Sequence, residues 1–251
     1  MVATKSPSST VFVFDYSKHG SMPVDGVSAP QHRCLGHKAE GYGLSWNPVK
    51  EGQLLSGAND GLICIWDVSQ PSVDLAPLST RSRHASAVED VDWHKKHGFM
   101  FGSVGDDGRL VIWDTREALD SVVTEVLKAH ESDVHCLSFN PVNEFLLATG
   151  GADGAVKLWD LRNMQRSIHD FAAHKEAVYQ VSWAPFNESI LGSSSSDRRL
   201  HVWDLSRIGE EQSPEEAEDG PPELLFIHGY RDRAAFSFSS LLSSCVILMR
   251  G

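Results

Sequence analysis

The chain has 251 residues, 41% of them hydrophobic, and a formal net charge of −12 at pH 7. This hydrophobic content is sufficient for a packed core. The negative net charge argues against non-specific binding of nucleic acid, which needs clustered Lys and Arg. The four cysteines form no Cys-x-x-Cys motif, so we expect neither a zinc site nor a disulfide framework, and a reducing, intracellular compartment is indicated.

The first 35 residues predict two short strands. Val11–Asp15 alternates valine and phenylalanine, and a second apolar-centred run lies at Arg33–Leu35. We interpret the first as the last strand of an incomplete repeat and the second as the outer strand that follows it.

Four copies of one unit then follow, each marked by His, Ser or Thr, Asp and Trp. Relative to His, the other three residues always lie 19, 23 and 29 positions later, whereas successive His residues advance by 47, 46 and 44. A fixed unit with variable connectors indicates one structural element copied several times. The four sets are His37–Ser56–Asp60–Trp66, His84–Ser103–Asp107–Trp113, His130–Thr149–Asp153–Trp159 and His174–Ser193–Asp197–Trp203.

Within the first unit, three strands are expected between His37 and Asp67. Pro48 ends the first, and an Asp-Gly turn joins the second to the third. Short strands at a period of about 40–45 residues are typical of a β-propeller blade, so the predicted class is all-β. The expected strands are Tyr42–Trp46, Leu54–Gly57 and Leu62–Trp66.

His, Ser and Asp in one unit also suggest a hydrolase triad. Catalysis needs one site, however, and four equivalent copies favour a structural network in which Asp orients His, His reaches the hydroxyl, and the hydroxyl reaches the indole N–H. We therefore expect no enzyme and no cofactor. His94 and His97, three residues apart, are expected in a solvated loop rather than at a metal.

An acidic segment, 206–223, separates Trp203 from the next expected strand, Leu224–Ile227. Six of the ten residues from Glu210 to Asp219 are acidic, and Pro221-Pro222 follows them. Such a segment is either a disordered solubilising loop or an acidic rim beside an apolar strand, which would suit a basic amphipathic helix. Ser213, before Pro214, is a predicted phosphorylation site.

The repeats resemble WD-repeat proteins, since each tetrad Trp is followed by Asp. The acidic segment, together with five further stretches, resembles the histone-binding WD-repeat family of the retinoblastoma-binding proteins and the small subunit of chromatin assembly factor. The resemblance covers about residues 2 to 229, and we predict residues 1–229 to be one partial propeller domain. The further stretches are Ala3–Ser9, Val13–Tyr16, His37–Pro48, Val88–His94 and Asp197–Leu200.

This resemblance implies a nuclear, non-catalytic scaffold that binds core histones for chromatin assembly, deacetylase or methyltransferase complexes. Glu216, Glu218 and Asp219 would face basic residues of the first helix of the histone H-four type, and Phe226 and Ile227 would pack on its apolar side. A second surface would take a basic histone tail. Its matching positions are Glu40, Tyr42, Glu89 and Tyr179, but Ala177 and His135 replace an acid and an amide of the family.

Two further features bear on function. Arg116 and Arg162 each complete the pattern Trp-Asp-x-Arg, which in some WD-repeat proteins docks the adaptor of a cullin ubiquitin ligase, although an exposed Arg is common there. The family closes its ring with seven blades, whereas four complete blades and partial ones are expected here. Such an arc would expose blade faces that a closed ring buries, so we expect marginal stability. Residues 230–251 look unlike a blade and form a predicted divergent tail.

Overall fold

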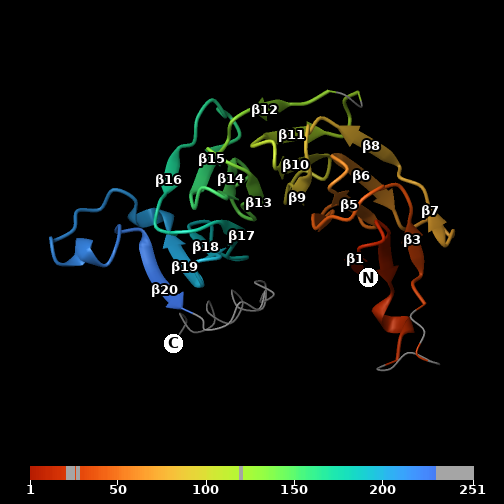
Figure 1. The fold of residues 1–251 in the computed structure, drawn as a ribbon, viewed down its shortest axis with the longest axis horizontal. Coiled ribbons are helices and arrows are strands. Elements are labelled where there is room, and N and C mark those ends of the chain that lie inside the picture. The colour runs from red at the N-terminus through yellow and green to blue at the C-terminus, as the bar shows by residue number, and fades with distance from the viewer. Residues whose placement is uncertain (21–25, 27–28, 119–120, 230–251) are drawn as a thin grey trace. The chain divides into compact units, whose positions relative to one another are not determined.

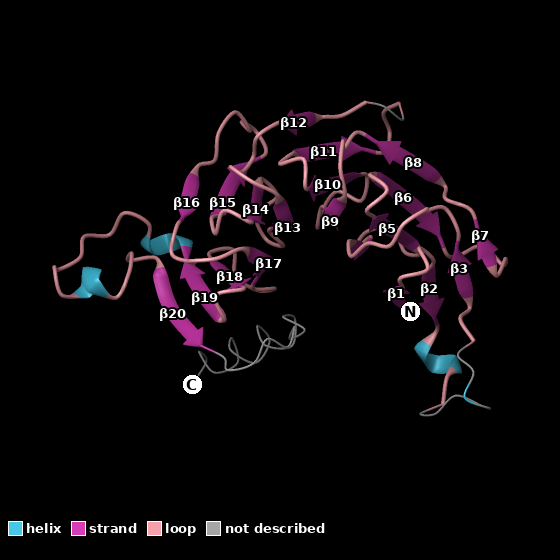
Figure 2. Ribbon diagram, viewed as in Figure 1, coloured by secondary structure: helices cyan, strands magenta, loops and turns pink. Residues whose placement is uncertain are grey.

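The structure is a computed structural model that describes residues 1–20, 26, 29–118 and 121–229 (Figure 1). Its ordered elements are twenty β-strands and short 3-10 turns, so the predicted all-β class is confirmed (Figure 2). None of the helices in these ranges is long and apolar enough to cross a membrane. The predicted divergent tail, 230–251, lies outside the described residues.

The strands form five four-stranded sheets, distributed over two units, 1–125 and 126–251. Unit 1 holds the N-terminal sheet, the first repeat sheet and the second repeat sheet. In strand order along each sheet, these are β1 (Val2–Lys5), β2 (Val11–Phe14), β3 (His32–Cys34) and β7 (Asp74–Leu75); β4 (Leu44–Trp46), β5 (Gln53–Gly57), β6 (Leu62–Asp67) and β8 (Ser79–Ser82); and β12 (Thr124–Val126), β11 (Leu110–Asp114), β10 (Met100–Gly105) and β9 (Val88–Trp93). The last strand of the second repeat sheet, β12, extends one residue into unit 2.

Unit 2 holds the third and fourth repeat sheets. Their strands are β13 (Val134–Phe139), β14 (Leu146–Gly151), β15 (Val156–Asp160) and β16 (His169–Phe171); and β17 (Val178–Trp183), β18 (Ile190–Ser195), β19 (Arg199–Asp204) and β20 (Leu224–Gly229). All pairs within these two sheets are antiparallel. The predicted strand Leu224–Ile227 is therefore present and two residues longer than expected.

The N-terminal sheet differs from its prediction. The sequence indicated two strands there, but β1 adds a third, and β7 pairs with β3 in parallel as a fourth. The backbone N–H groups of Arg33 and Leu35 donate to the carbonyls of Val73 and Leu75 at 2.7 and 2.8 Å. The Arg33 guanidinium also binds the Asp74 carboxylate with two hydrogen bonds, at 2.7 and 2.9 Å. A two-residue strand is too short to show periodicity, which is why the sequence did not reveal β7.

Apolar side chains from neighbouring sheets of each unit make the core. In unit 1, Val11, Val13 and Cys34 of the N-terminal sheet pack with Trp66 and other residues of the first repeat sheet. A second cluster joins the first and second repeat sheets, and in unit 2 a third joins the two remaining sheets. Burial of inward-facing side chains fixes the register of the strands, because a slip by one residue would turn every inward side chain to the opposite face of its sheet.

The prediction that His94 lies in a solvated loop is wrong, because His94 is buried, with 1% of its surface exposed. Its Nδ1 accepts the backbone N–H groups of Lys96 and His97 at 3.1 and 3.0 Å. The Oδ1 atoms of Asn47 and Asn140 accept the same two N–H groups in the first and third repeats. His94 is thus a structural replacement for the asparagine of the neighbouring Asn-Pro turns.

The predicted Asp-Gly turns join the second and third strands of the first three repeat sheets. Gly61, Gly108 and Gly154 have φ angles of 74°, 71° and 77°, which only glycine adopts without steric cost. In the fourth sheet Arg198 occupies the corresponding position, with φ of 63°. The fourth turn therefore holds a strained non-glycine residue in the same left-handed conformation.

Arg198→Gly is expected to raise the free energy of unfolding by up to about 1 kcal/mol. Relief of the left-handed backbone gains about 1–2 kcal/mol, and the added freedom of glycine in the unfolded chain costs about 0.5–1 kcal/mol. Urea unfolding of both proteins measures the difference. A variant less stable than the parent would show that the Arg198 side chain stabilises the turn.

Candidate functional site

Each repeat sheet contains a hydrogen-bonded tetrad built from the predicted residues. His precedes the first strand, Ser or Thr lies in the second, Asp in the turn, and Trp in the third. Imidazole Nε2 lies 2.7–2.8 Å from the hydroxyl oxygen, and the indole N–H donates to that oxygen at 2.8–2.9 Å. Imidazole Nδ1 lies 3.0–3.3 Å from the Asp carboxylate. All sixteen predicted residues are therefore brought together in their four sets.

The geometry fixes the direction of the proton donors. A carboxylate can only accept, so Nδ1–H donates to Asp, and Nε2 then accepts the hydroxyl proton. The hydroxyl oxygen in turn accepts the indole N–H, so every buried polar atom of the four tetrads has a partner. The hydroxyls of Ser56, Ser103, Thr149 and Ser193 belong to residues with 0% exposure, so they are closed to a substrate.

The tetrad carboxylates are held in their charged form. Burial opposes ionisation of Asp153, but hydrogen bonds from His130 and from the backbone amides of Ala155 and Glu131 outweigh it and lower its pKa to about 2. A permanently charged acceptor keeps the imidazole in one tautomer and orientation.

Thr149→Val is expected to lower the free energy of unfolding by about 2 kcal/mol, because it leaves the indole N–H of Trp159 and Nε2 of His130 buried without a partner. Thr149→Ser is the matched control, since the other three tetrads use serine and the hydroxyl is kept. Chemical denaturation of both variants provides the measurement. Equal stabilities of the two variants would mean that the hydroxyl network contributes little.

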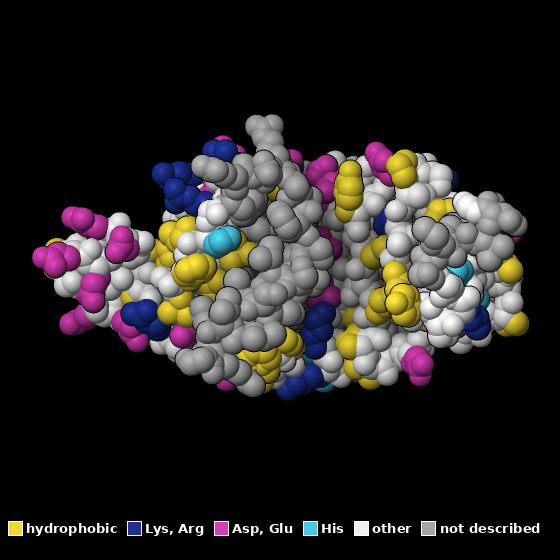
Figure 3. Space-filling model, turned by 90° about the horizontal axis from the view of Figure 1, so that it is seen from below, with side chains coloured by type: hydrophobic (Ala, Val, Ile, Leu, Met, Phe, Trp, Pro, Cys, Tyr) yellow, Lys and Arg dark blue, Asp and Glu magenta, His cyan; other side chains and the backbone are white. Residues whose placement is uncertain are grey.

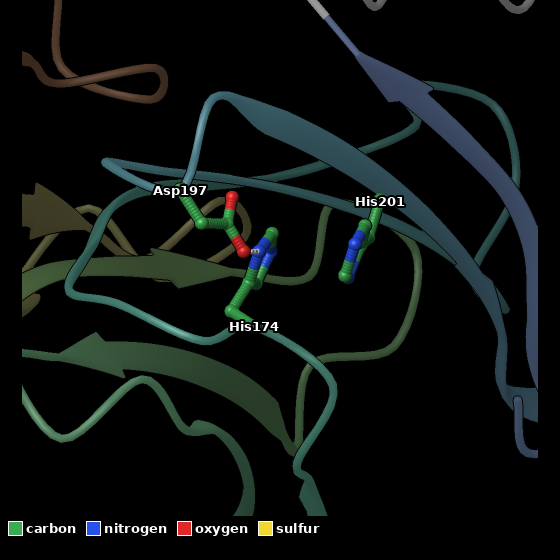
Figure 4. Close-up of side chains that lie close together, drawn as sticks. All are labelled: His174, Asp197 and His201. Atoms are coloured by element: carbon green, nitrogen blue, oxygen red, sulfur yellow. Dashed lines mark hydrogen bonds and ion pairs between the residues drawn. The ribbon is translucent and has the colours of Figure 1, made fainter.

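The fourth tetrad has an additional histidine, which the sequence analysis did not single out. His201 is fully buried, neither of its ring nitrogens has a hydrogen-bond partner among the described residues, and its ring stacks on His174 at 3.8 Å with planes 6° apart (Figure 4). Ligand atoms of His174, Asp197 and His201 lie within 4.8 Å of one another. Because the two rings are parallel, the lone pairs of their nitrogens lie in parallel planes and do not converge on one point. Both nitrogens of His174 are also already hydrogen-bonded. This arrangement therefore does not form a metal site.

Burial lowers the pKa of His201 to about 4, and the neighbouring His174 and Arg199 add to the shift. The pKa of His174 is lowered as well, mainly by burial. Since the folded protein resists protonation at His201 more than the unfolded chain does, this residue favours folding above the unfolded pKa of 6.5. The stability is lost as the pH falls from 6.5 toward 4.

His201→Val is expected to reduce the acid sensitivity of the protein. Valine occupies the same position of the second repeat sheet, at Val111, so the substitution follows the chain's own pattern. Relative to the variant, the parent should lose about 2 kcal/mol of stability between pH 7 and pH 5, from the difference between the two pKa values. Urea unfolding at several pH values checks this, and parallel pH profiles would contradict it.

The acidic segment forms an exposed turn between β19 and β20. The 3-10 helix η3 (Leu205–Arg207) overlaps its start and η4 (Glu216–Glu218) lies within it. Its acidic side chains gather at one end of the face in Figure 3, beside hydrophobic ones. The Glu216 carboxylate accepts the backbone N–H and hydroxyl of Ser213, both at 2.9 Å. Glu218 and Asp219 are exposed and make no side-chain hydrogen bond or ion pair with the described residues.

Glu223 anchors the end of this segment and was not identified from the sequence. It is buried with 5% exposure, and its carboxylate meets His169 Nε2 at 2.8 Å. Its carbonyl accepts the backbone N–H of Asp204 at 2.8 Å. On β20, which follows, Phe226 and Ile227 keep 44% and 39% of their surface exposed. The predicted carboxylates and the predicted apolar residues thus lie on one anchored element.

The predicted histone-tail residues fall in both units. Glu40, Tyr42 and Glu89 belong to unit 1, where Tyr42 is 73% exposed. Tyr179 belongs to unit 2, is 60% exposed and stacks on His135 at 5.1 Å. Each unit therefore presents an exposed tyrosine among the predicted contact residues.

The two Trp-Asp-x-Arg arginines are held within their own sheets. Arg116 binds the Asp114 carboxylate at 3.0 and 2.6 Å and lies 3.5 Å above the Phe99 ring. Arg162 repeats this arrangement with Asp160, at 2.9 and 2.6 Å, and with the ring of Phe145 at 4.7 Å. Both side chains thus have a structural role that accounts for the motif.

Repeated four-stranded sheets locked by identical buried tetrads define a propeller-type scaffold. A family model described as "WD domain, G-beta repeat" (WD40) matches residues 28–67, 75–114, 121–160 and 165–204, which together make up more than half of the chain. The chain belongs to the WD40 repeat family. WD40 repeat domains are typically non-catalytic scaffolds for protein–protein interaction, and the repeat sheets are its blades.

Proposed function

We propose that this protein is a non-catalytic, nuclear scaffold that binds core histones. The observation that carries the proposal is the anchored acidic turn next to the exposed apolar residues of β20. An amphipathic basic helix offers the complementary surface, with cations for the carboxylates and an apolar face for Phe226 and Ile227. The first helix of the histone H-four type has this chemistry in the family that the sequence resembles.

In this proposal the three predicted carboxylates of the segment have different roles, and the contacts inside the segment support the division. Glu218 and Asp219 are the binding residues, because their side chains are exposed and have no partner among the described residues. Glu216 shapes the turn through Ser213. A phosphate on Ser213 would replace the hydroxyl that Glu216 binds and would add negative charge to the same surface.

The scaffold would bring its histone to chromatin assembly, deacetylase or methyltransferase complexes, whose subunits are further proposed partners. The tyrosine-bearing surfaces with Glu40, Glu89 and Tyr179 are proposed to take basic histone tails. The ligase-receptor alternative carries no separate proposal, because Asp114, Asp160 and their aromatic neighbours already account for Arg116 and Arg162.

Replacing Glu218 and Asp219 together by Lys is expected to weaken binding of a peptide from the histone H-four first helix about tenfold, through lost and reversed charge pairs. Fluorescence anisotropy with the labelled peptide measures the dissociation constant, and raising the salt should reduce the difference.

The control is the double replacement of Glu51 and Glu117 by Lys, which changes the net charge equally at two exposed positions of unit 1. It is expected to leave binding close to that of the parent. Equal loss in both double variants would reduce the effect to overall charge, and unchanged binding in the first would reject the role of the acidic segment.

A further inference from the structure

We infer that Lys175, Arg198 and Arg199 form a second binding surface, which takes an acidic peptide segment of a partner protein. We call these three residues the basic corner. The surface is separate from the acidic segment and does not depend on the proposed histone function.

The three residues are gathered around one buried carboxylate. Asp197 Oδ2 accepts the backbone N–H of Lys175 at 3.1 Å, and Asp197 Oδ1 accepts that of Arg199 at 2.9 Å. Arg198 lies between Asp197 and Arg199 in the turn that joins β18 to β19. The tetrad therefore fixes the backbone from which all three cationic side chains extend.

Their charges are not neutralised by the rest of the described chain. None of the three makes a side-chain hydrogen bond or a salt bridge there, whereas Arg83, Arg109 and most other arginines are paired. Asp197 is occupied by its tetrad, and Glu176 is the one exposed carboxylate among residues 174–176 and 197–199. Burial is the main cause of the lowered pKa values of His174 and His201, and the charge of Arg199 lowers both further.

The other repeats show that this concentration of charge is not part of the blade itself. At the three corresponding positions the first repeat has Lys38, Gly61 and Leu62, and the third has Glu131, Gly154 and Ala155. The second has Ala85, Gly108 and Arg109, and that arginine is bound to Glu125. Only the fourth repeat presents three cations there.

Backbone strain at Arg198 is a second, independent observation. The three equivalent turns use glycine at this left-handed position, and the fourth places an arginine there with φ of 63°. A residue held in a disfavoured conformation where glycine would serve is a sign of a functional side chain. Arginine offers a planar set of donors that suits carboxylates, which glycine lacks.

An acidic peptide fits the corner better than nucleic acid does. Three cations can bind a short run of Asp or Glu, whereas a nucleic acid strand would extend onto the remainder of a protein with net charge −12. The corner would thus give the scaffold a surface of opposite sign to the acidic segment, so that two chemically different partners can be held by one blade.

The test uses the whole chain and a fluorescein-labelled peptide of about eight glutamates at low ionic strength, followed by anisotropy. Arg198→Gly and Lys175→Glu are each expected to raise the dissociation constant about fivefold, the loss of one charge-assisted contact. Arg198→Gly should do so with a thermal midpoint at or above that of the parent, which separates lost binding from lost folding.

Lys38→Glu is the matched control, because Lys38 occupies the position of Lys175 in the first repeat without the two arginines. Its dissociation constant should equal that of the parent. Failure of the peptide to bind, unchanged binding in Arg198→Gly and Lys175→Glu, equal loss in Lys38→Glu, or preference for a labelled single-stranded DNA over the peptide would each overturn the inference. Binding of the histone peptide should be the same in all three variants.

Discussion

The buried indole N–H of each blade is the constraint on which the rest of this structure depends. Taken out of water without an acceptor, such a donor costs about 1–3 kcal/mol, a large part of the 5–15 kcal/mol that stabilises a typical domain. The serine or threonine hydroxyl accepts it, and because this hydroxyl is buried too, its own proton needs an acceptor, which is the imidazole. The imidazole in turn needs the Asp carboxylate to fix its tautomer. One polar atom thus requires three further residues, and the spacing between them cannot change without breaking the chain of donors.

This constraint explains how much could be predicted from the sequence. The four tetrads, the strands β5 and β6 and the turns at Gly61, Gly108 and Gly154 follow from it, because each contains or joins tetrad residues. The parallel pairing of β7 does not follow, since it rests on a few backbone contacts in a connector whose length varies between repeats. His94 was misread for a similar reason. Its burial depends on accepting two backbone N–H groups, a role that the neighbouring repeats give to asparagine.

The repeats also act as internal references for one another, and their departures carry information that the family pattern does not. His201 stands where the other blades have Cys64, Val111 and Lys157, and Arg198 stands where they have glycine. A comparison of the four repeats at these two positions therefore identifies both His201 and Arg198 as unusual from the sequence alone. The sequence could not show that the His201 ring stacks on His174, or that its nitrogens have no partner among residues 1–20, 26, 29–118 and 121–229. Both depend on the distance between a loop and a strand.

Apart from His94, the departures that change exposed charge or burial lie in the fourth blade. It contains the buried histidine whose ring nitrogens lack a hydrogen-bond partner in the described part of the chain, the strained arginine and the acidic insertion between β19 and β20. Its tetrad is nevertheless complete, with the same distances as the others. A network that satisfies its own polar groups leaves the turn and the outer connection free to vary, since neither contributes a donor or acceptor beyond Asp197. The blade can therefore expose negative charge on its outer connection and positive charge at its turn without loss of the fold. These are the two places at which the proposed partners of opposite charge would bind, without competing for the same side chains.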